Sequence, residues 1–595
     1  MDEVVSQTGD KLLDITAKVF SSGTFSGNPL TMTTGLATVT ELEKDKVYPH
    51  VNRLGDMIGK GLAESELQFV CTPRSGFRRM FLPIHVMRIE LNHETETRPK
   101  RLSSENYVPA SQRSSEECVA VSVGRVSKFA RERNVRMIDL KFTDLIGRWR
   151  HVTLPIRKLD GQLFTEGAAF DGSSVPGFKS VEASDLSILP DPGTIALDPF
   201  SHVPTLSMIC NVVESDSKKP FSGDPRHIAK KAEGYLVRSG IADQSYWGLE
   251  LELYVFDSIR YRQDRMFGYY YIKSREGSSD DQDGKEPSLG YNLPPRGGYY
   301  AIPPSDTLYD LRMEMMEALE ECGVAAISHH HEGGGLGQME FAVAHEPLMK
   351  AADTAMLAKY VIKNVAVRHG KTATFMPKPV NHEATNALHV HQSLVQAGEP
   401  IFYDSQGYAQ LSKTAMYYIG GVLRHASALL ALTSPSTNSY KRLLPGYEEP
   451  TTLSFSSANR TACIRIPSSG ASPRAKRIEY RAQDASCNIY LALAAILMAG
   501  LDGIQDKIDP ITEGFGPFDV DIDKLSQEER TSIKSLPCSL REALQCLEAE
   551  HEFLTRGEVF DEDFIERWIN YKTQMEVVPV ETCVHPYEYY LYYDV

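Results

Sequence analysis

The chain has 595 residues, a formal net charge of −16 at pH 7, 42% hydrophobic residues and 24% charged residues. These values are ordinary for a soluble globular protein, and the length allows two or more domains around a large core. Because affinity for nucleic-acid phosphates comes from Lys and Arg, the acidic balance excludes a general nucleic-acid binder. It leaves room for a small anionic substrate held by a local cluster of Arg.

Cysteines and apolar runs indicate the compartment. The nine cysteines include no CxxC pair, so they indicate reduced thiols in a cytoplasmic protein rather than a disulfide framework. The N-terminus, MDEVVSQTGD, begins acidic and lacks the apolar core of a signal peptide. The longest apolar run, Ile489 to Leu501, is too short to span a bilayer and predicts a buried helix. We therefore expect a protein without a membrane partner.

The predicted elements begin after a polar stretch. Residues 95–117 are nearly free of large aliphatic side chains, which is typical of a linker. Residues 135–155 alternate apolar and polar residues in two runs and predict antiparallel strands. Residues 224–240 have helical periodicity, with Asp224 as the N-cap and Pro225 at the first helical position. Strands and long helices then mix without regular βαβ spacing, which favours the α+β class.

The stretch ISHHHEGGGLGQMEF, residues 327–341, carries two glutamates around a glycine-rich centre. Three glycines after Glu332 favour a strand–turn–strand path that would bring Glu332 close to Glu340. Two neighbouring carboxylates are unfavourable unless a cation or proton lies between them. The alternative is a surface turn with solvated glutamates. The three histidines remain ambiguous, because adjacent side chains on a strand point to opposite faces.

Two further stretches place polar residues two apart. Glu250 and Glu252 in GLELELYVFD would share one face of a strand, as would His389 and His391 in ATNALHVHQSL. Each pattern also fits a half-buried strand with a wet face or structural histidines. Four glutamates on candidate strands without a sulfur ligand nevertheless match the chemistry of a hard cation.

A fourth stretch, SPRAKRIEYRAQD, surrounds Glu479 with Arg474, Lys476, Arg477 and Arg481. Such a cluster can be a surface ion-pair network. It is also what a carboxylate or phosphate substrate requires, since Arg binds these groups bidentately.

Taken together, these stretches resemble the glutamine synthetase family from about Val135 to Val595, in order and with family-like spacing. The tail, HPYEYYLYYDV, resembles the ending of the bacterial type I enzyme. The motifs that carry the resemblance are FDGSS with the following EASD, GLELELYVFD, SHHHE, GKTATFMPKP, TNSYKRLLPGYEEP, NRTACIRIP and KRIEYR.

The resemblance implies an α+β fold in two domains. A small β-grasp domain would span residues 131–223. A glutamine synthetase catalytic domain over residues 224–595 would have a curved antiparallel sheet with surrounding helices. It also implies a homo-oligomer, a dodecamer of two stacked hexameric rings, whose active sites are shared between neighbouring subunits.

The resemblance also implies two divalent cations, Mg²⁺ or Mn²⁺, in each site. Both ions prefer oxygen ligands, and one imidazole makes Mn²⁺ a credible occupant. By motif position, the first cation would be held by Glu252, Glu332 and Glu340, and the second by Glu250, His389 and Glu479.

The implied reaction is ATP-dependent ligation of ammonium to L-glutamate, giving glutamine through γ-glutamyl phosphate. The cations and arginines would offset the charge on the transferring phosphoryl group. Asp171, from the neighbouring subunit, would bind and deprotonate ammonium, and Glu448 would close the site against water. The implied contacts are Arg442, Arg460 and Arg481 for glutamate or the transferred phosphate, Arg460 also counting as catalytic, and His391, Ser393, Arg465 and Arg474 for ATP.

The sequence departs from the family at one turn. Ala384, Thr385, Asn386 and Ala387 stand where the family usually has Asn-Gly-Ser-Gly, which restricts backbone angles and adds Cβ atoms near the substrate. A γ-glutamyl ligase acting on an amine or polyamine is therefore an alternative. A non-catalytic relative is a third reading, disfavoured by the retained metal and ammonium positions.

The N-terminal segment has a different resemblance. Residues 23–44, GTFSGNPLTMTTGLATVTELEK, resemble part of a class III aminotransferase close to glutamate-1-semialdehyde aminotransferases. The cofactor-binding lysine of that family belongs to a region missing here, so we expect no pyridoxal phosphate. We predict an aminotransferase-like fragment over residues 1–69 and a linker over residues 70–130.

Overall fold

The structure is a computed structural model that describes part of the chain. The described residues are 115–277, 290–446, 449–468, 472–520, 524–526, 528 and 533–595. The aminotransferase-like segment, the polar stretch up to residue 114 and Glu448 lie outside them. Helix α4 (Ser115–Glu132) begins within the stretch predicted as linker. Its Val126 and Ala130 are buried in the core of the following sheet, which explains why a helix forms there.

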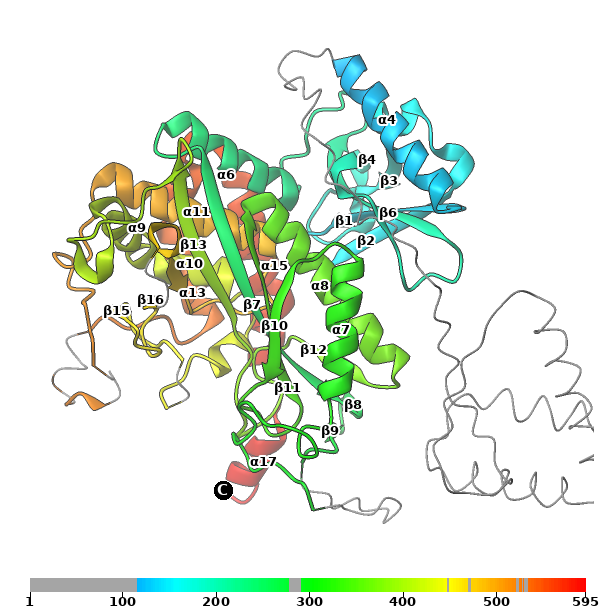
Figure 1. The fold of residues 1–595 in the computed structure, drawn as a ribbon. Helices are drawn as coiled ribbons and strands as arrows, with labels where there is room; N and C mark the ends of the chain where they lie inside the picture. Colours follow the sequence, from blue (N-terminus) through cyan, green and yellow to red (C-terminus); the bar gives the residue numbers. More distant parts are fainter. Residues whose placement is uncertain are drawn as a thin grey trace, which may run out of the picture. The chain divides into compact units, whose positions relative to one another are not determined.

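A six-stranded sheet follows α4 (Figure 1). The strand order is β2-β1-β6-β4-β3, with β5 on β6. The two runs predicted as antiparallel strands pair as expected, from Met137 opposite Pro155 to Thr143 opposite Trp149. Between β3 and β4 the chain forms short turns, and α5 (Gly161–Thr165) precedes β3. The strands are β1 (Met137–Thr143), β2 (Trp149–Pro155), β3 (Ala168–Asp171), β4 (Asp185–Pro190), β5 (Ala196–Leu197) and β6 (Thr205–Glu214).

The second domain is built on a nine-stranded sheet. Its order is β10-β11-β7-β13-β17-β16-β15, with β12 paired to β7 and β14 paired to β13. Every pairing is antiparallel except that of β15 with β16. The strands are β7 (Gln244–Phe256), β10 (Ala326–His331), β11 (Gln338–Pro347), β12 (Thr372–Thr374), β13 (Leu388–Gln396), β14 (Glu399–Pro400), β15 (Phe455–Ser457), β16 (Ile464–Ile466) and β17 (Ile478–Tyr480). This sheet with its helices confirms the predicted α+β class.

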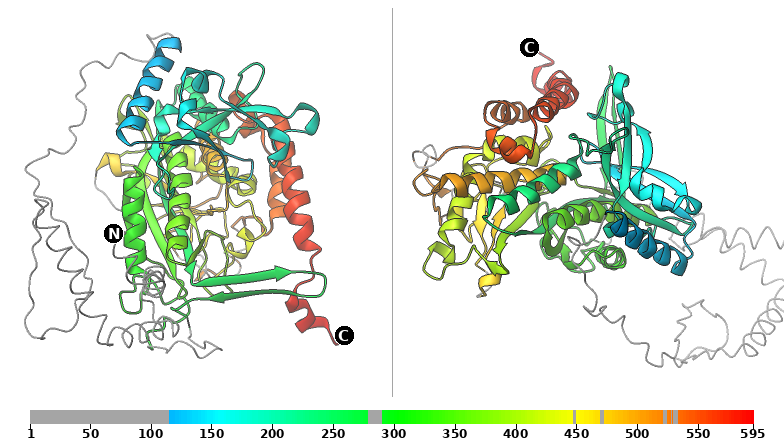
Figure 2. Two further views of the ribbon diagram at one scale, coloured as in Figure 1. Left: turned by 90° about the vertical axis from the view of Figure 1, so that its right-hand side faces the viewer. Right: turned by 90° about the horizontal axis from the view of Figure 1, so that it is seen from above.

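A separate hairpin, β8 (Ser258–Gln263) with β9 (Gly268–Lys273), projects from the second domain as a long ribbon (Figure 2). Tyr261, Tyr269, Tyr270 and Tyr271 are exposed on its two faces.

Helix α6 (Pro225–Ser239) begins and ends as the sequence predicts. The Asp224 carboxylate accepts a hydrogen bond from the Arg226 amide, Pro225 is the first helical residue, and Gly240 closes the helix in the left-handed conformation.

Helix α11 (Ile489–Asp506) contains the long apolar run. Among the described residues it is the one helix long and apolar enough to cross a membrane, and 83% of its length is buried inside the protein. It packs against α6 and α9, and α6 and α11 lie side by side in the view from above (Figure 2). The prediction of a buried helix is confirmed.

The second domain has nine further α-helices among its described residues, and the last of them, α17, is exposed. They are α7 (Tyr309–Glu321), α8 (Leu348–Arg368), α9 (Lys413–Arg424), α10 (Ala426–Thr433), α13 (Leu540–Ala549), α14 (Glu552–Thr555), α15 (Glu562–Lys572), α16 (Val578–Glu581) and α17 (Pro586–Tyr592).

Candidate active site

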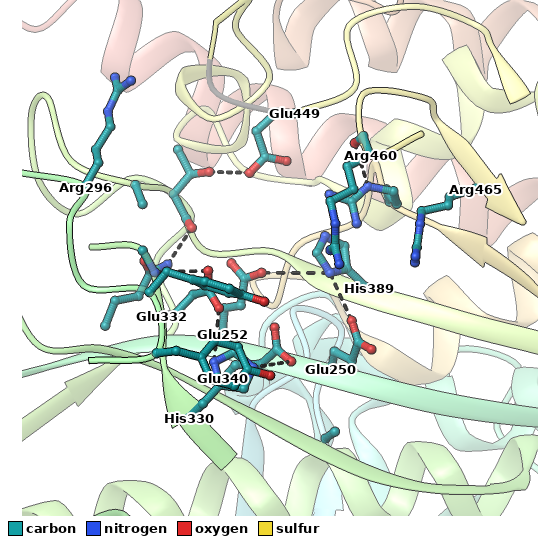
Figure 3. Close-up of a pocket in the computed structure, with 18 of the residues that line it drawn as sticks. Glu250, Glu252, Arg296, His330, Glu332, Glu340, His389, Glu449, Arg460 and Arg465 are labelled. Carbon is teal, nitrogen blue, oxygen red and sulfur yellow. Dashed lines mark hydrogen bonds and ion pairs between the residues drawn. The ribbon is translucent and has the colours of Figure 1, made fainter. Parts of the chain in front are cut away.

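A cavity of about 840 Å³ opens over β7, β10, β11 and β13 and the loops beside them (Figure 3). In this view Arg460 and Arg465 lie on one side, and Glu332 and Glu340 lie on the other. Its carboxylates are Glu250, Glu252, Glu332, Glu340 and Glu449, and its arginines are Arg296, Arg460, Arg465 and Arg481.

Strand register brings the acidic residues together. Glu340 on β11 is directly opposite Glu252 on β7, and His330 on β10 is opposite Glu340. Residues opposite each other on neighbouring strands share one face of the sheet. Glu332 follows β10, and its amide donates to the Gln338 carbonyl across the hairpin. The predicted approach of Glu332 to Glu340 is confirmed.

The same register places the histidines beside Glu250. His389 on β13 pairs with Glu250, and His391 pairs with Glu479 on β17. The Nδ1 of His389 lies 3.3 Å from Glu250, and Nε2 of His391 lies 2.9 Å from it. The two histidines therefore share one face, as their spacing predicts.

Crowding changes the acidity of these carboxyls. Burial, followed by the charge of Glu340, raises the pKa of Glu332 to about 7. Burial and the charges of Glu332 and Glu340 raise the pKa of Glu252 well above its usual value. Burial alone would raise the pKa of Glu250 too, but its hydrogen bonds with His389 and His391 hold that pKa below the usual range. Without a cation, the Glu252–Glu332 side of the cavity therefore retains protons near neutral pH.

Three groups of side chains in or beside the cavity have the spacing of a metal site, with three ligand atoms within 4.8 Å of one another. Five of the six residues predicted as metal ligands fall in these groups. Glu252 does not, and its carboxylate accepts a hydrogen bond from the Ala387 amide at 2.7 Å. The groups are His330–Glu332–Glu340, Glu250–Glu340–His389 and Glu250–His391–Glu479.

His389 offers the clearest sign that the residues fit a cation. Its Nε2 is buried and has no hydrogen-bond partner among the described residues. Because Nδ1 faces Glu250, the ring can donate from Nδ1 and keep the Nε2 lone pair available. A buried nitrogen without a partner, on a ring whose other nitrogen faces Glu250 and Glu252, suits a divalent cation.

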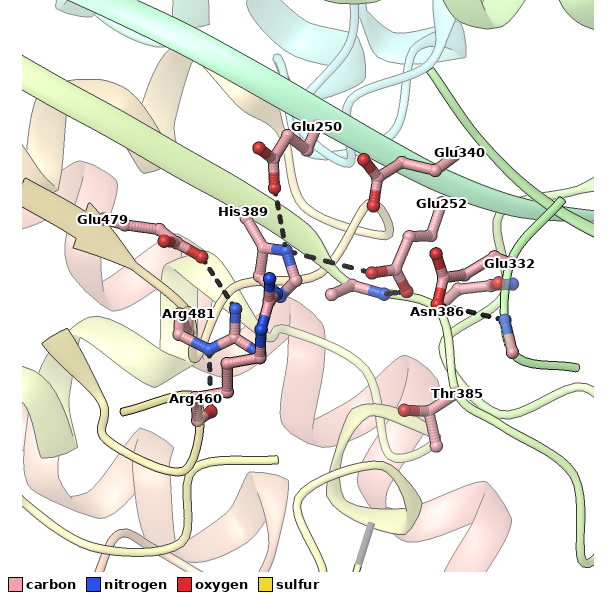
Figure 4. Close-up of polar contacts among 12 residues, drawn as sticks. Glu250, Glu252, Glu332, Glu340, Thr385, Asn386, His389, Arg460, Glu479 and Arg481 are labelled. Atoms are coloured by element: carbon pink, nitrogen blue, oxygen red, sulfur yellow. Dashed lines mark hydrogen bonds and ion pairs between the residues drawn. The ribbon is translucent and has the colours of Figure 1, made fainter. Parts of the chain in front are cut away.

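Glu479 fixes two arginines, of which Figure 4 shows Arg481. Arg481 donates to Glu479 at 2.7 Å and to the Arg460 carbonyl at 2.9 Å, and Arg465 donates to the other oxygen of Glu479. Burial opposes ionisation of Glu479, but Arg481 outweighs it and the pKa of Glu479 is lowered to about 2. The pairing holds both guanidinium groups at the cavity edge.

Several residues with predicted roles do not line this cavity. Arg442 and Glu479 are buried behind it, and His391 lies beside Glu250 without facing the opening. Ser393 is further along β13, and Arg474 is exposed.

Asp171, at the end of β3, is also outside the cavity. Its carboxylate accepts hydrogen bonds from Ser173 and Ser174, which lower the pKa of Asp171 to about 2. It is therefore ionised and able to attract a cation.

The sequence motifs did not predict several other residues that line the cavity. Tyr300 stacks on His330 with ring centroids 4.6 Å apart. Thr385 donates its hydroxyl hydrogen bond to Glu449, whose other oxygen lies 2.5 Å from Arg442. Glu449 could have been noticed beside Glu448 in PGYEEP, whereas nothing in the sequence signals Tyr300.

The glycine-poor turn, residues 384–387, lies in the cavity wall. None of its four residues has a positive φ, so the backbone conformation does not require glycine. Tyr254 donates to the Ala384 carbonyl at 2.9 Å, and Gln338 donates to the Thr385 carbonyl at 2.7 Å. The turn is thus built into the site by residues of β7 and β11.

Comparison with known proteins covers both domains. Residues 134–215 match the family described as glutamine synthetase, beta-Grasp domain, and residues 222–592 match glutamine synthetase, catalytic domain. A glutamine synthetase of Frankia alni is 47% identical over 471 residues, covering 79% of this chain and 98% of that protein. One of Mycobacterium tuberculosis is 46% identical over 475 residues, with the same coverage.

Solved structures agree. Plasmodium falciparum glutamine synthetase superposes with a TM-score of 0.71 at 27% identity, covering 79% of this chain and 98% of that one. A structure described as a GmaS/ADP complex gives 0.64 at 28% identity, covering 79% and 99%.

Proposed function

The chain belongs to the glutamine synthetase family, and from this premise we propose that its cavity joins ammonium to the γ-carboxylate of L-glutamate at the expense of ATP. One observation carries the proposal. A single cavity brings carboxylates and a histidine suited to divalent cations together with arginines suited to phosphate and carboxylate. Making an amide from a carboxylate and ATP needs both sets of groups at once.

We propose that two divalent cations, Mg²⁺ or Mn²⁺, are held by Glu250, Glu252, Glu332, Glu340, His389 and Glu479. When bound, they would supply charge neutralisation to the transferring phosphoryl group. The unpartnered Nε2 of His389 and the raised pKa values of Glu252 and Glu332 support this assignment.

The arginines orient the anionic reactants. We propose that Arg465, which Glu479 fixes at the cavity edge, contacts the nucleotide phosphates, and that His391, Ser393 and Arg474 contribute to ATP binding from beside the cavity. Arg460 and Arg481 meet the phosphoryl group and glutamate. Fixed guanidinium groups stabilise the transition state without reorganising during the reaction.

The second half-reaction forms the amide. Ammonium loses a proton, the resulting ammonia attacks the γ-carbonyl of γ-glutamyl phosphate, and phosphate leaves. We propose that Asp171 attracts ammonium to the site of a neighbouring copy in a homo-oligomeric ring, as in the predicted dodecamer. Glu448 is proposed to shield the intermediate from water. We place the reaction in the cytoplasm, without pyridoxal phosphate.

The turn at residues 384–387 keeps a second candidate open, a γ-glutamyl ligase for an amine or polyamine. Its Thr385 side chain and Ala384 methyl line the cavity where the family usually has glycine and asparagine. These side chains change the shape of the wall and leave the cation groups intact.

Phosphate release distinguishes the candidates. The purified protein is given ATP, glutamate and Mg²⁺ or Mn²⁺, with ammonium or a panel of amines, and the product is identified by mass. We expect ammonium-dependent release with glutamine as product. Release only with an amine would select the second candidate. Glu513→Gln, which removes an exposed ion pair with Arg424, serves as the matched control and should retain wild-type rates.

A further inference from the structure

A carboxylate of the protein itself covers one arginine beside the cavity. Arg442 is fully buried and does not line the cavity, whereas Glu449 does. The Oε2 of Glu449 lies 2.5 Å from Nη2 of Arg442. A ligand in the cavity therefore meets Glu449 before it can reach the Arg442 guanidinium.

Glu449 does not use all the hydrogen-bond donors of the Arg442 guanidinium. Arg442 Nη2 also donates to the Arg481 carbonyl at 2.8 Å, and Nη1 donates to the Ala482 carbonyl at 3.3 Å. Its Nε is buried without a hydrogen-bond partner among the described residues. Arginine binds a carboxylate most strongly through two parallel hydrogen bonds, so one nitrogen remains available for a better-placed carboxylate.

Thr385 holds Glu449 in place beside Arg442. Its hydroxyl donates to Oε1 of Glu449, so the turn fixes one carboxylate oxygen while the other oxygen faces the arginine. Thr385 in turn is held through its carbonyl by Gln338. The position of Glu449 therefore depends on the turn that carries Thr385 and, through that turn, on Gln338 of β11.

Two of the four arginines that line the cavity are already paired with a carboxylate of the protein. Arg465 and Arg481 both pair with Glu479. Glutamate brings two carboxylates of the same chemistry as the Glu449 side chain. A dicarboxylate that enters the cavity thus finds a buried arginine already occupied by an equivalent group.

We propose that Glu449 is a specificity-determining, built-in competitor: its carboxylate occupies Arg442 in the substrate-free site, and glutamate binds by displacing it from that arginine. Thr385 is the positioning residue that sets how firmly Glu449 is held. The inference rests on the proposed function, because it takes glutamate as the substrate. Affinity for glutamate is then reduced by the fraction of molecules in which Arg442 is covered.

The test compares KM for glutamate with KM for ATP in four variants. Glu449→Gln keeps the shape and an acceptor for Thr385 but removes the charge, and KM for glutamate should fall about tenfold. Thr385→Val keeps the Glu449 charge but removes the hydroxyl, and KM for glutamate should fall about twofold to threefold. Thr385→Ser keeps the hydroxyl, so KM for glutamate should stay near the wild-type value. Glu513→Gln removes a distant Glu–Arg pair and controls for the loss of charge.

A through-space effect of charge alone would lower KM for glutamate in Glu449→Gln but leave it unchanged in Thr385→Val. That pattern overturns the proposal, as does an unchanged or higher KM in Glu449→Gln. KM for ATP should stay at the wild-type value in all four variants, and a parallel fall would also overturn it. If Glu449→Gln does not fold, judged by its thermal midpoint, the Thr385→Val and Thr385→Ser pair decides.

Failure of the proposed function has a different signature. It would appear as a wild-type protein that forms no glutamine from ammonium. Direct calorimetric titration of glutamate onto the Mg²⁺-loaded wild type and Glu449→Gln then still tests the inference. Tighter binding by the variant supports competition at Arg442, and equal or weaker binding contradicts it.

Discussion

Glu252 and Glu340 face each other on two neighbouring strands, and Glu332 lies next to Glu340 directly after β10. Burial and the repulsion among these carboxylates shift two of their pKa values. The pKa of Glu332 is raised to about 7, and that of Glu252 lies well above its usual value. A cation must displace these protons, because metal ligands bind in their deprotonated form.

Cation binding should therefore release protons near neutral pH, and affinity for Mg²⁺ or Mn²⁺ should weaken as pH falls below about 7. Calorimetric titration in buffers with different ionisation enthalpies measures the protons released. Glu332→Gln should release fewer protons than the wild type. Binding with no proton release at pH 7 would contradict the cluster's assignment.

At this scale the sequence predicts contacts within an element better than contacts between distant elements. The i, i+2 spacing of Glu250 and Glu252 sets their shared face, and the glycines after Glu332 predict its hairpin. The contact of Thr385 with Glu449 joins segments 64 residues apart. No local sequence pattern predicts a contact between such distant segments, so this contact was found only in the structure.

At the scale of elements, the packing of α9 on α11 depends on residues without a side chain. A Cβ built at Gly421 on α9 would collide with the backbone of Ala499 and Gly503 on α11. The two helices can approach this closely only because both carry glycine at the crossing.

Gly421→Ala should destabilise the protein by about 1–3 kcal/mol, because the backbone of a packed helix cannot move aside easily. Urea unfolding measures the loss. Gly234→Ala is the matched control in α6, where the nearest atom is the flexible end of Arg238. That change should be neutral or stabilise by up to about 1 kcal/mol. Equal losses would show that the α9–α11 crossing tolerates a side chain.

The β1–β2 pair contains a buried charge cluster around Asp139. The Lys141 ammonium lies 2.8 Å from Asp139, and His151 and Thr153 on β2 also contact its carboxylate. Burial opposes ionisation of Asp139, but Lys141 and these hydrogen bonds outweigh it and lower its pKa. A carboxyl whose pKa is lowered on folding contributes stability above its unfolded pKa of about 4.

That contribution should disappear as pH falls from about 4 through the lower folded pKa. Asp139→Asn cannot titrate, so its unfolding free energy should fall less steeply than that of the wild type between neutral and acidic pH. Denaturant unfolding at a series of pH values gives both slopes. If the unfolding free energies of both proteins fell equally steeply with pH, Asp139 would not contribute to the loss of stability in acid.

Elements with strong local signals were predictable, and others were not. Capping residues and apolar period located α6 and α11 within the chain. Strands of two or three residues, such as β12 and β14, are too short to show a period and exist because a longer strand offers them an edge. The start of α4 at Ser115 was not predictable, because the sequence before it is polar. The apolar residues of α4 gain their core by packing on the sheet.

At the scale of the whole molecule, Arg226 links the two domains. Its guanidinium forms two hydrogen bonds with Asp353 on α8, at 3.0 and 2.8 Å. It also reaches Asp191 and Asn211 of the N-terminal sheet domain at 2.9 and 2.7 Å. Being buried and shared between the domains, it helps to fix their relative orientation.

Arg226→Met should cost about 3–5 kcal/mol, because it leaves Asp353 buried without its charge partner. Arg424→Met breaks an exposed pair with Glu513 and should cost about 0–1 kcal/mol. Urea midpoints and slopes of both variants provide the comparison. A similar small loss in the two would show that the junction does not depend on Arg226.

The position of α11 in the chain has a consequence for biosynthesis. The core of the N-terminal sheet domain uses residues no later than Phe221, so it can close while the ribosome is still translating. The core of the second domain packs around α11, residues 489–506, which contacts α6, α8, α9, α10 and α14. Strands and helices made hundreds of residues earlier therefore expose apolar surface until α11 emerges. During that interval the nascent chain needs protection from aggregation, and a ribosome stalled before residue 489 would leave one folded domain and one without its centre.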